Sequence, residues 1–149
     1  MSGFDFRLDR VLDLRRAEVK QRAQEYAGAR AALRVAEERV ADLEAARIRG
    51  RADDPTRTDA TAGSFAVIDE ALRSIEMQLQ EAERIRMEAV SRVEEAGEAL
   101  AAARQQTRAL ERLRGRAFDR WRVQAAAREQ HILDDLARNS HPSSLRPTF

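Results

Sequence analysis

The fold is decided by residues 65–110, which read FAVIDEALRSIEMQLQEAERIRMEAVSRVEEAGEALAAARQQTRAL. Apolar residues recur in this stretch every seven positions, in two sets that lie three residues apart. The first set comprises Phe65, Leu72, Leu79, Val93 and Leu100, and the second comprises Ile68, Ile75, Ala82, Ala89, Ala96, Ala103 and Leu110. Such a repeat places one narrow apolar stripe along a long α-helix and is typical of a coiled coil.

A shorter stripe of the same kind precedes this one. Its two sets comprise Leu12, Val19, Tyr26, Leu33 and Val40, and Leu8, Ala29, Ala36 and Leu43. Charged residues make up 36% of the chain and aromatic residues only 5%, a balance that suits long helices rather than a globular core. We therefore predict an all-α fold, a long antiparallel two-helix coiled-coil hairpin in which the second helix is longer than the first.

The turn-forming residues between the stripes set the expected boundaries. We predict a single coiled-coil domain over residues 1–138, with helices over 4–49 and 64–138. The connecting residues 50–63, GRADDPTRTDATAG, form the predicted tip loop, because Gly50 offers a helix stop and Pro55 disfavours helix. Residues 139–149 contain two prolines and no apolar period, so we predict a disordered tail.

The unequal stripes leave part of the second helix without a partner. If the chain folds back at the centre of the tip, residue i of the first helix lies beside about residue 113 − i of the second. Phe6 then lies near Thr107, and the second helix projects alone from Arg108 onward. Arg15, Arg22 and Arg86 fall on seam positions, where we expect their stems to lie along the seam and their charges to stay in water.

The predicted projecting end is the candidate binding surface. Residues 104–128 hold eight arginines and two acids, whereas residues 69–98 hold nine acids and four arginines. The projecting end also carries Trp121, and tryptophan and arginine often supply binding hot spots. Three roles remain open: docking to a partner protein, self-association of two projecting ends, and contact of the arginines with nucleic-acid phosphates.

Residues that carry catalysis or bind metals do not form a recognisable pattern. The chain has no cysteine, its two histidines His131 and His141 lack helical metal-site spacing, and it has no glycine-rich phosphate loop. We therefore predict neither an enzyme nor a metal or cofactor site. No apolar run approaches the roughly 18 residues of a membrane span, and charges interrupt the N-terminus, so we expect a cytosolic protein.

Three stretches resemble one family in order and spacing. They are FDFRLDRVLDLRRAEVKQRAQEYAGARAALRVAEERV (4–40), FAVIDEALRSIEMQLQEAE (65–83) and LERLRGRAFDRWRVQAAAREQHILDDLA (110–137). Together they resemble the bacterial flagellar export protein family FliJ. The resemblance implies an antiparallel coiled coil similar to the central stalk of rotary ATPases, working in flagellar type III protein export at the inner membrane.

The resemblance also implies partners. They are the ring of the export ATPase (FliI-like), whose assembly the protein promotes, the cytoplasmic domain of the export gate (FlhA-like), and export chaperones. The residues implied to face the ring are Phe4, Phe6, Leu8, Leu12, Leu110, Leu113, Arg114, Arg116, Phe118, Arg120, Trp121 and Arg122. Those implied to face the gate are Arg39, Leu43, Ala46, Ile68, Leu72 and Ile75.

Two alternatives to this reading stay open. The same shape serves as the stalk protein of a virulence type III secretion system. A cytosolic coiled-coil scaffold that self-associates through its projecting end is also compatible with the pattern. Under the flagellar reading we expect a monomer, peripherally associated with the inner membrane at the flagellar base, with no nucleic acid and no small-molecule substrate among its ligands.

Overall fold

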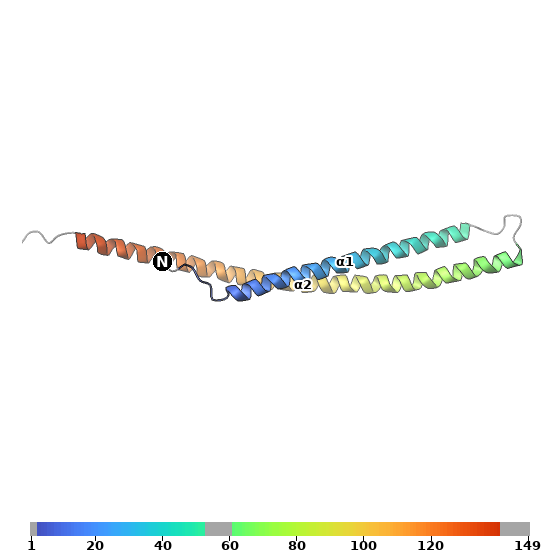
Figure 1. Ribbon diagram of the computed structural model, residues 1–149, viewed down its shortest axis with the longest axis horizontal. Coiled ribbons are helices and arrows are strands. Elements are labelled where there is room, and N and C mark those ends of the chain that lie inside the picture. Colours follow the sequence, from blue (N-terminus) through green and yellow to red (C-terminus); the bar gives the residue numbers. More distant parts are fainter. Residues whose placement is uncertain (1–2, 53–60, 141–149) are drawn as a thin grey trace, which may run out of the picture. The chain divides into compact units, whose positions relative to one another are not determined.

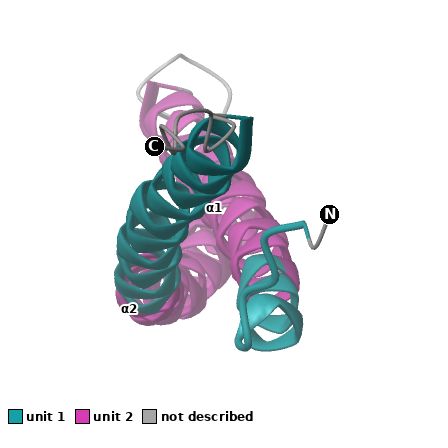
Figure 2. Ribbon diagram, turned by 90° about the vertical axis from the view of Figure 1, so that its left-hand side faces the viewer, with its two compact units in different colours: residues 1–16, 105–149 teal, residues 17–104 magenta. Residues whose placement is uncertain are grey.

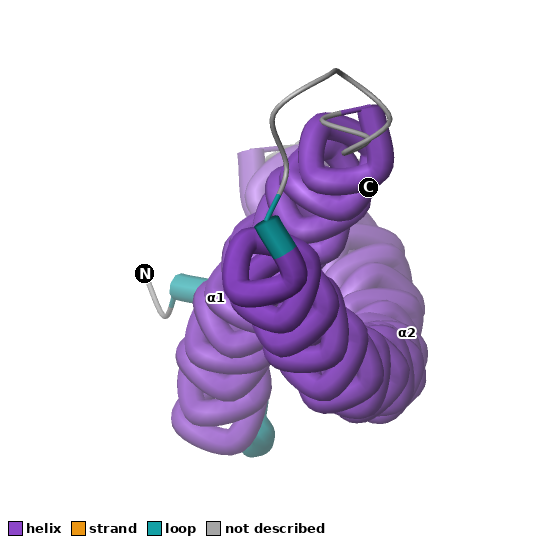
Figure 3. The backbone as a smooth tube through the Cα atoms, turned by 90° about the vertical axis from the view of Figure 1, so that its right-hand side faces the viewer, coloured by secondary structure: helices purple, strands orange, loops and turns teal. Residues whose placement is uncertain are grey.

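Two long helices make up the chain in a computed structural model that describes residues 3–52 and 61–140. Helix α1 spans Asp9–Ala52 and helix α2 spans Ala62–Ser140 (Figure 1). The described residues contain no strand (Figure 3). The helices pack against each other and α2 is the longer, which confirms the predicted all-α hairpin.

Helix α1 begins at Asp9, after the two phenylalanines that were expected inside it. A turn precedes the helix, because the Asp9 N–H donates to the carbonyl oxygen of Phe6 at 2.9 Å. The acidic side chain of Asp9 occupies the first turn, where the positive end of the helix dipole favours it. Phe4 and Phe6 therefore belong to a non-helical N-terminal segment, residues 3–8, rather than to the helix.

Gly50, expected to end the first helix, lies within it. A Cβ atom at this position would lie 3.0 Å from Cδ2 of Leu72, so glycine here permits a close approach of the two helices. The helix continues to Ala52, with Arg49 and Arg51 in its last turn. Only part of the expected tip, residues 50–52 and 61–63, is described, and it is mostly helical. The remaining tip residues, 53–60, lie outside the described residues.

Helix α2 begins beside Thr61, whose carbonyl oxygen accepts hydrogen bonds from the Ser64 N–H at 2.9 Å and the Ser64 hydroxyl at 2.8 Å. As expected, Gly97 and Gly115 do not interrupt this helix. At its end the Ser140 hydroxyl donates to the Ala137 carbonyl oxygen at 3.0 Å. The rest of the expected tail, residues 141–149, lies outside the described residues.

The chain divides into two compact units (Figure 2). Unit 2 comprises residues 17–104, and unit 1 comprises residues 1–16 and 105–149. In unit 2 the core consists of Val40, Leu43 and Ala82, with Leu79 packed against it. Its other buried apolar residues, Ala36, Ala89, Leu100 and Ala103, also lie on the predicted stripes, which confirms that the stripes form the seam.

The helices of unit 2 pair in a register other than the expected one. The Tyr26 ring lies 3.4 Å from where a Cβ of Gly97 would be, and Gly50 lies against Leu72. Residue i of α1 therefore lies beside about residue 122 − i of α2, where 113 − i was expected. A seven-residue repeat does not choose between registers, because the apolar stripe continues through successive heptads. In the observed register the Tyr26 ring packs opposite Gly97, which has no side chain.

The register explains an unexpected pattern of burial near the tip. Phe65 lies on the predicted apolar stripe, yet it is 46% exposed, and Ile68 and Leu72 are only half-buried. In the observed register no described residue of α1 lies opposite Phe65. Two of the three seam arginines, Arg22 and Arg86, are half-buried and pair on their own helices, with Glu25 at 3.1 Å and Glu83 at 2.8 Å.

Candidate docking site

Three aromatic rings from the two ends of the chain meet in unit 1. The Phe4 ring lies edge-on to Phe118 at a centroid distance of 5.2 Å and tilted against Trp121 at 5.9 Å. Phe118 and Trp121, three residues apart on α2, stack at 5.8 Å. We call these three residues the aromatic cluster. Because aromatic pairs in such geometries attract each other, the cluster holds the N-terminal segment on α2.

Arg114 binds the N-terminal segment at two points. Its Nε donates to Oδ1 of Asp9 at 3.0 Å, and its guanidinium carbon lies 5.6 Å from the centroid of the Phe4 ring. One side chain on α2 thus forms an ion pair at the start of α1 and a cation–π contact with the aromatic cluster. A second pair in the same unit joins Arg16 to Glu111 at 3.4 Å.

These contacts correct the expected start of the projecting end. We expected α2 to stand alone from Arg108 onward, but Glu111, Arg114 and Phe118 all contact residues from the start of the chain. The shifted register accounts for this, because Asp9 pairs with Arg114 rather than with a residue near 104. Beyond Ala125 every described residue of α2 is exposed, including Ile132, Leu133 and Leu136 at 60% each.

All of the residues implied to face the ATPase ring fall in unit 1. Leu12 is the most buried of them at 1% exposure, and Phe6 is buried at 9%. Leu8, Leu110 and Trp121 are half-buried, whereas Leu113 and Phe118 are exposed at 46% and 41%. Phe6 and Leu12 therefore form the local core, and the aromatic cluster with Leu113 supplies the accessible apolar surface.

Exposed arginines lie near the aromatic cluster along α2, on two sides of the helix. At about 100° per residue, Arg122 shares the side of Phe118 and Trp121, whereas Arg116 and Arg120 project from the opposite side. Arg116 and Arg120 form no ion pair with any described residue, and Arg122 lies 3.9 Å from Asp119. Arg114 differs from these three because it already binds Asp9 and Phe4. This part of α2 thus carries partly exposed aromatic rings on one side and free guanidinium groups on the other, the residue types that most often anchor protein interfaces.

The residues implied to face the export gate fall in unit 2, and several of them pack the helices together. Leu43 is 5% exposed and belongs to the core, and Leu72 lies against Gly50. Arg39 donates to the Oε1 atom of Gln78 at 3.0 Å. The large apolar side chains that are exposed to solvent in this unit are different residues: Val35, Ile48, Phe65, Val67, Met77, Ile85 and Met87.

One shallow groove of unit 2 was not expected from the sequence. It is lined by Arg39, Met77, Gln78, Glu81, Ala82 and Ile85. Met77 is 72% exposed and Ile85 is 46% exposed. Neither Met77 nor Ile85 lies on the seam stripe. Apolar residues outside the heptad pattern were therefore the sequence feature from which this groove could have been predicted.

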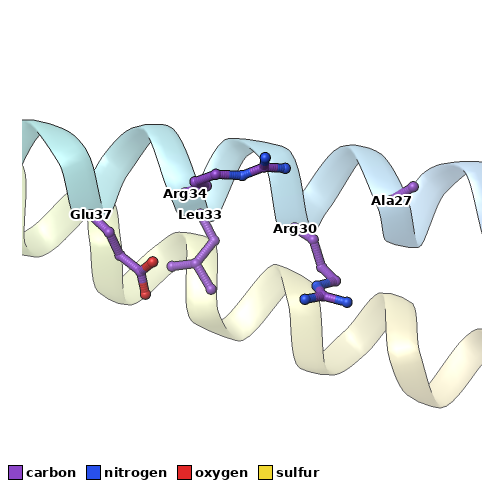
Figure 4. Close-up of a pocket in the computed structure, with 5 residues that line it drawn as sticks. All are labelled: Ala27, Arg30, Leu33, Arg34 and Glu37. Carbon is purple, nitrogen blue, oxygen red and sulfur yellow. The ribbon is translucent and has the colours of Figure 1, made fainter.

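Another hollow of unit 2 is open and is lined mainly by charged residues. Its lining residues are Ala27, Arg30, Leu33, Arg34 and Glu37, all on α1 (Figure 4). Leu33 extends from α1 toward the α2 ribbon, and Arg34 runs along α1 (Figure 4). The lining offers two guanidinium groups and one carboxylate, without a nucleophile beside a base. Such a set supplies no recognisable catalytic arrangement.

One group of ion pairs in unit 2 lies entirely within α2. Arg84 donates to Glu81 at 2.6 Å and also pairs with Glu88, which holds the pKa of Glu81 below its ordinary range and raises the pKa of Arg84. Within residues 3–52 and 61–140, no three His, Cys, Asp or Glu residues group in a way that could hold a metal ion. No helix in these ranges is both long and apolar enough to cross a membrane.

Comparison with known proteins decides the family. The family model for the flagellar FliJ protein matches residues 4–145, a range that includes all of α1 and α2. The chain belongs to the FliJ family. The sequence resemblance is thereby confirmed, and membership implies a stalk role in the flagellar export apparatus for a non-catalytic component. Searches among curated proteins and among solved structures gave no match.

Proposed function

We propose that this member of the FliJ family docks in the ring of the flagellar export ATPase through unit 1. Docking promotes ring assembly and links the ring to the export gate and to export chaperones. The protein then works in the cytoplasm, at the inner membrane beneath the flagellar base. Family membership supports the stalk role, and the aromatic cluster flanked by arginines is the single observation that supports unit 1 as the docking end.

The chemistry of unit 1 favours a protein partner with an apolar pocket and an acidic rim. Phe118 and Trp121 offer apolar contact area in a half-open setting, and Arg116 and Arg120, on the opposite side of α2, need carboxylates from a partner that surrounds the helix. The arginines steer the approach of an acidic surface, so binding should weaken as ionic strength rises.

For the gate, we propose the face of unit 2 that includes Arg39, Ala46, Ile68 and Ile75, with Leu43 and Leu72 as the packing beneath it. Arg39 also lines the groove that contains Met77 and Ile85, so a gate domain on this face would reach additional exposed apolar side chains. Exposed apolar groups beside a polar rim are typical of transient protein interfaces.

A pull-down tests both interfaces. The full chain is immobilised and offered the cognate export ATPase and, separately, the cytoplasmic domain of the gate. We expect capture of both, with stimulation of ATP hydrolysis in the first case. The double variant Met77→Ser and Ile85→Ser should lose the gate domain and keep the ATPase. Absence of ATPase capture by the unmodified chain at low salt would refute ring docking.

Self-association through the end of α2 is a second candidate, because Ile132, Leu133 and Leu136 are each 60% exposed. Pairing of two such ends would bury these side chains against each other. Light scattering across a concentration series separates the two proposals. A mass that stays at 16.9 kDa throughout contradicts self-association, whereas a rise that Ile132→Ser abolishes supports it.

A further inference from the structure

The surface proposed for docking is built from two ends of the chain, and one arginine joins them. Phe4 lies in the N-terminal segment, before α1 begins, whereas Phe118 and Trp121 lie on α2. The six residues of this segment form neither helix nor strand, so no regular ladder of backbone hydrogen bonds holds them in place. Its position on α2 therefore depends on the side-chain contacts that it makes there.

We propose that Arg114 is the positioning residue that docks the N-terminal segment on α2 and thereby assembles the aromatic cluster. Its guanidinium contacts both ends of the N-terminal region: the Phe4 ring at 5.6 Å and the Asp9 carboxylate at 3.0 Å. Phe4 and Asp9 flank the residues that must cross from the aromatic cluster to the helix start. The Arg114 side chain thus holds the N-terminal segment near both of its ends, at Phe4 and at Asp9.

Burial of Phe6 also holds the N-terminal segment, but the other polar contacts of this region do not join both of its ends to α2. The Asp9 N–H bond to the Phe6 carbonyl shapes the turn before α1 but does not reach α2. The Arg16–Glu111 pair joins the helices further along α1, after the segment has ended. Among the described side chains, Arg114 alone makes a cation–π contact with the aromatic cluster and an ion pair with the first turn of α1.

The geometry also gives Arg114 a role different from that of its neighbours. Arg116 and Arg120 form no ion pair within the described residues, so their charges are available to an acidic partner. The charge of Arg114 is engaged inside unit 1. Removal of Arg114 should therefore change the arrangement of the aromatic rings, whereas removal of another exposed arginine should change only the electrostatic attraction of a partner.

The chain carries its own probe for this arrangement, because Trp121 is its only tryptophan. We would measure acrylamide quenching of Trp121 fluorescence in the full chain, with helical content followed by circular dichroism. Arg114→Gln should raise the quenching constant to the value of a Phe4→Leu variant, since both release the N-terminal segment. Arg108→Gln is the matched control, an exposed arginine of the same helix and unit, and should quench like the unmodified chain.

Two further variants separate positioning from a general effect of charge or fold. Arg114→Lys keeps a cation near Asp9 and Phe4 and should restore part of the protection of Trp121. Arg114→Gln added to Phe4→Leu should raise quenching no further, because each change by itself already releases the N-terminal segment from α2. Unchanged quenching in Arg114→Gln, or an equal rise in Arg108→Gln, would overturn the assignment.

The link to partner binding rests on the proposed function and is measured separately. Arg114→Gln should weaken binding to the export ATPase about fivefold, the equivalent of one cation–π contact and one exposed ion pair. Altered quenching together with unchanged ATPase binding would support Arg114 as the positioning residue and count against unit 1 as the docking end. Failure of the positioning role of Arg114 can therefore be distinguished from failure of unit 1 as the docking end.

Discussion

Replacement of Trp121 by alanine is the most direct test of unit 1 as the docking end. Trp121 contacts both other rings of the aromatic cluster, at centroid distances of 5.9 Å from Phe4 and 5.8 Å from Phe118. The substitution therefore removes a large accessible apolar group and also one of the contacts that hold the N-terminal segment. It leaves the helix intact, because alanine is the residue that helices favour most.

The expected loss follows from these contacts. The two aromatic pairs together contribute about 1–3 kcal/mol beyond the stabilisation from the area that they bury. This range bounds the stabilising free energy that unit 1 loses with these two contacts. For binding, truncation of a tryptophan hot spot costs about 2 kcal/mol or more, which corresponds to at least about a thirtyfold rise in Kd. The loss in binding should therefore be clear, while the helical circular dichroism signal stays nearly unchanged.

The assay is titration of the export ATPase with the full chain, read as binding heat and as stimulated ATP hydrolysis. Val123→Ala is the matched control, because Val123 lies on the same helix, is 67% exposed and makes no aromatic contact. We expect Val123→Ala to bind like the unmodified chain. If Trp121→Ala binds the ATPase as tightly as Val123→Ala does, the aromatic cluster is not the docking surface and the reasoning from it fails.

Two further predictions concern unit 2. Gly28→Ala should raise the free energy of unfolding by about 1 kcal/mol, because nothing lies within 4 Å of the new methyl group. Gly50→Ala should raise it less, because its methyl group would lie 3.0 Å from Cδ2 of Leu72, closer than an ordinary contact. Urea denaturation compares the two variants, and equal stabilisation would contradict the close approach of Gly50 and Leu72 in the observed register. Because Arg84 lowers the pKa of Glu81 in the folded chain, the stability that Glu81 contributes is present at neutral pH and is lost as the pH falls through that lowered pKa. Glu81→Gln should therefore show a smaller acid-induced drop in urea midpoint than the unmodified chain, and an identical drop would show that the pair contributes nothing.

Much of the seam was predictable from the sequence. Val40, Leu43 and Ala82 were assigned to the seam by their seven-residue spacing alone, and all three are buried. Spacing works in this case because an α-helix repeats locally, so that the face on which a residue lies depends only on its neighbours in the chain. The family, too, was recognisable from the order of three helical stretches, since the family model matches nearly the same range.

The sequence predicted which residues belong to the candidate site, but not how those residues are arranged. The family resemblance of the sequence implied that Phe4, Phe118 and Trp121 belong to one end of the molecule. It did not indicate that Phe4 lies outside the helix or that Arg114 bridges to Asp9. Contacts between the start and the end of a chain depend on how the two helices are aligned, and no local pattern encodes that alignment.

By itself the sequence determined that this protein is two long helices with one apolar seam, since amphipathic spacing is a property of each helix alone. The tertiary structure decided the register, because an apolar heptad stripe allows more than one pairing and the structure sets Tyr26 opposite Gly97 and Leu72 opposite Gly50. It also decided the arrangement of the proposed docking surface, where Asp9 lies beside Arg114 and the N-terminal segment packs on α2 through Phe4.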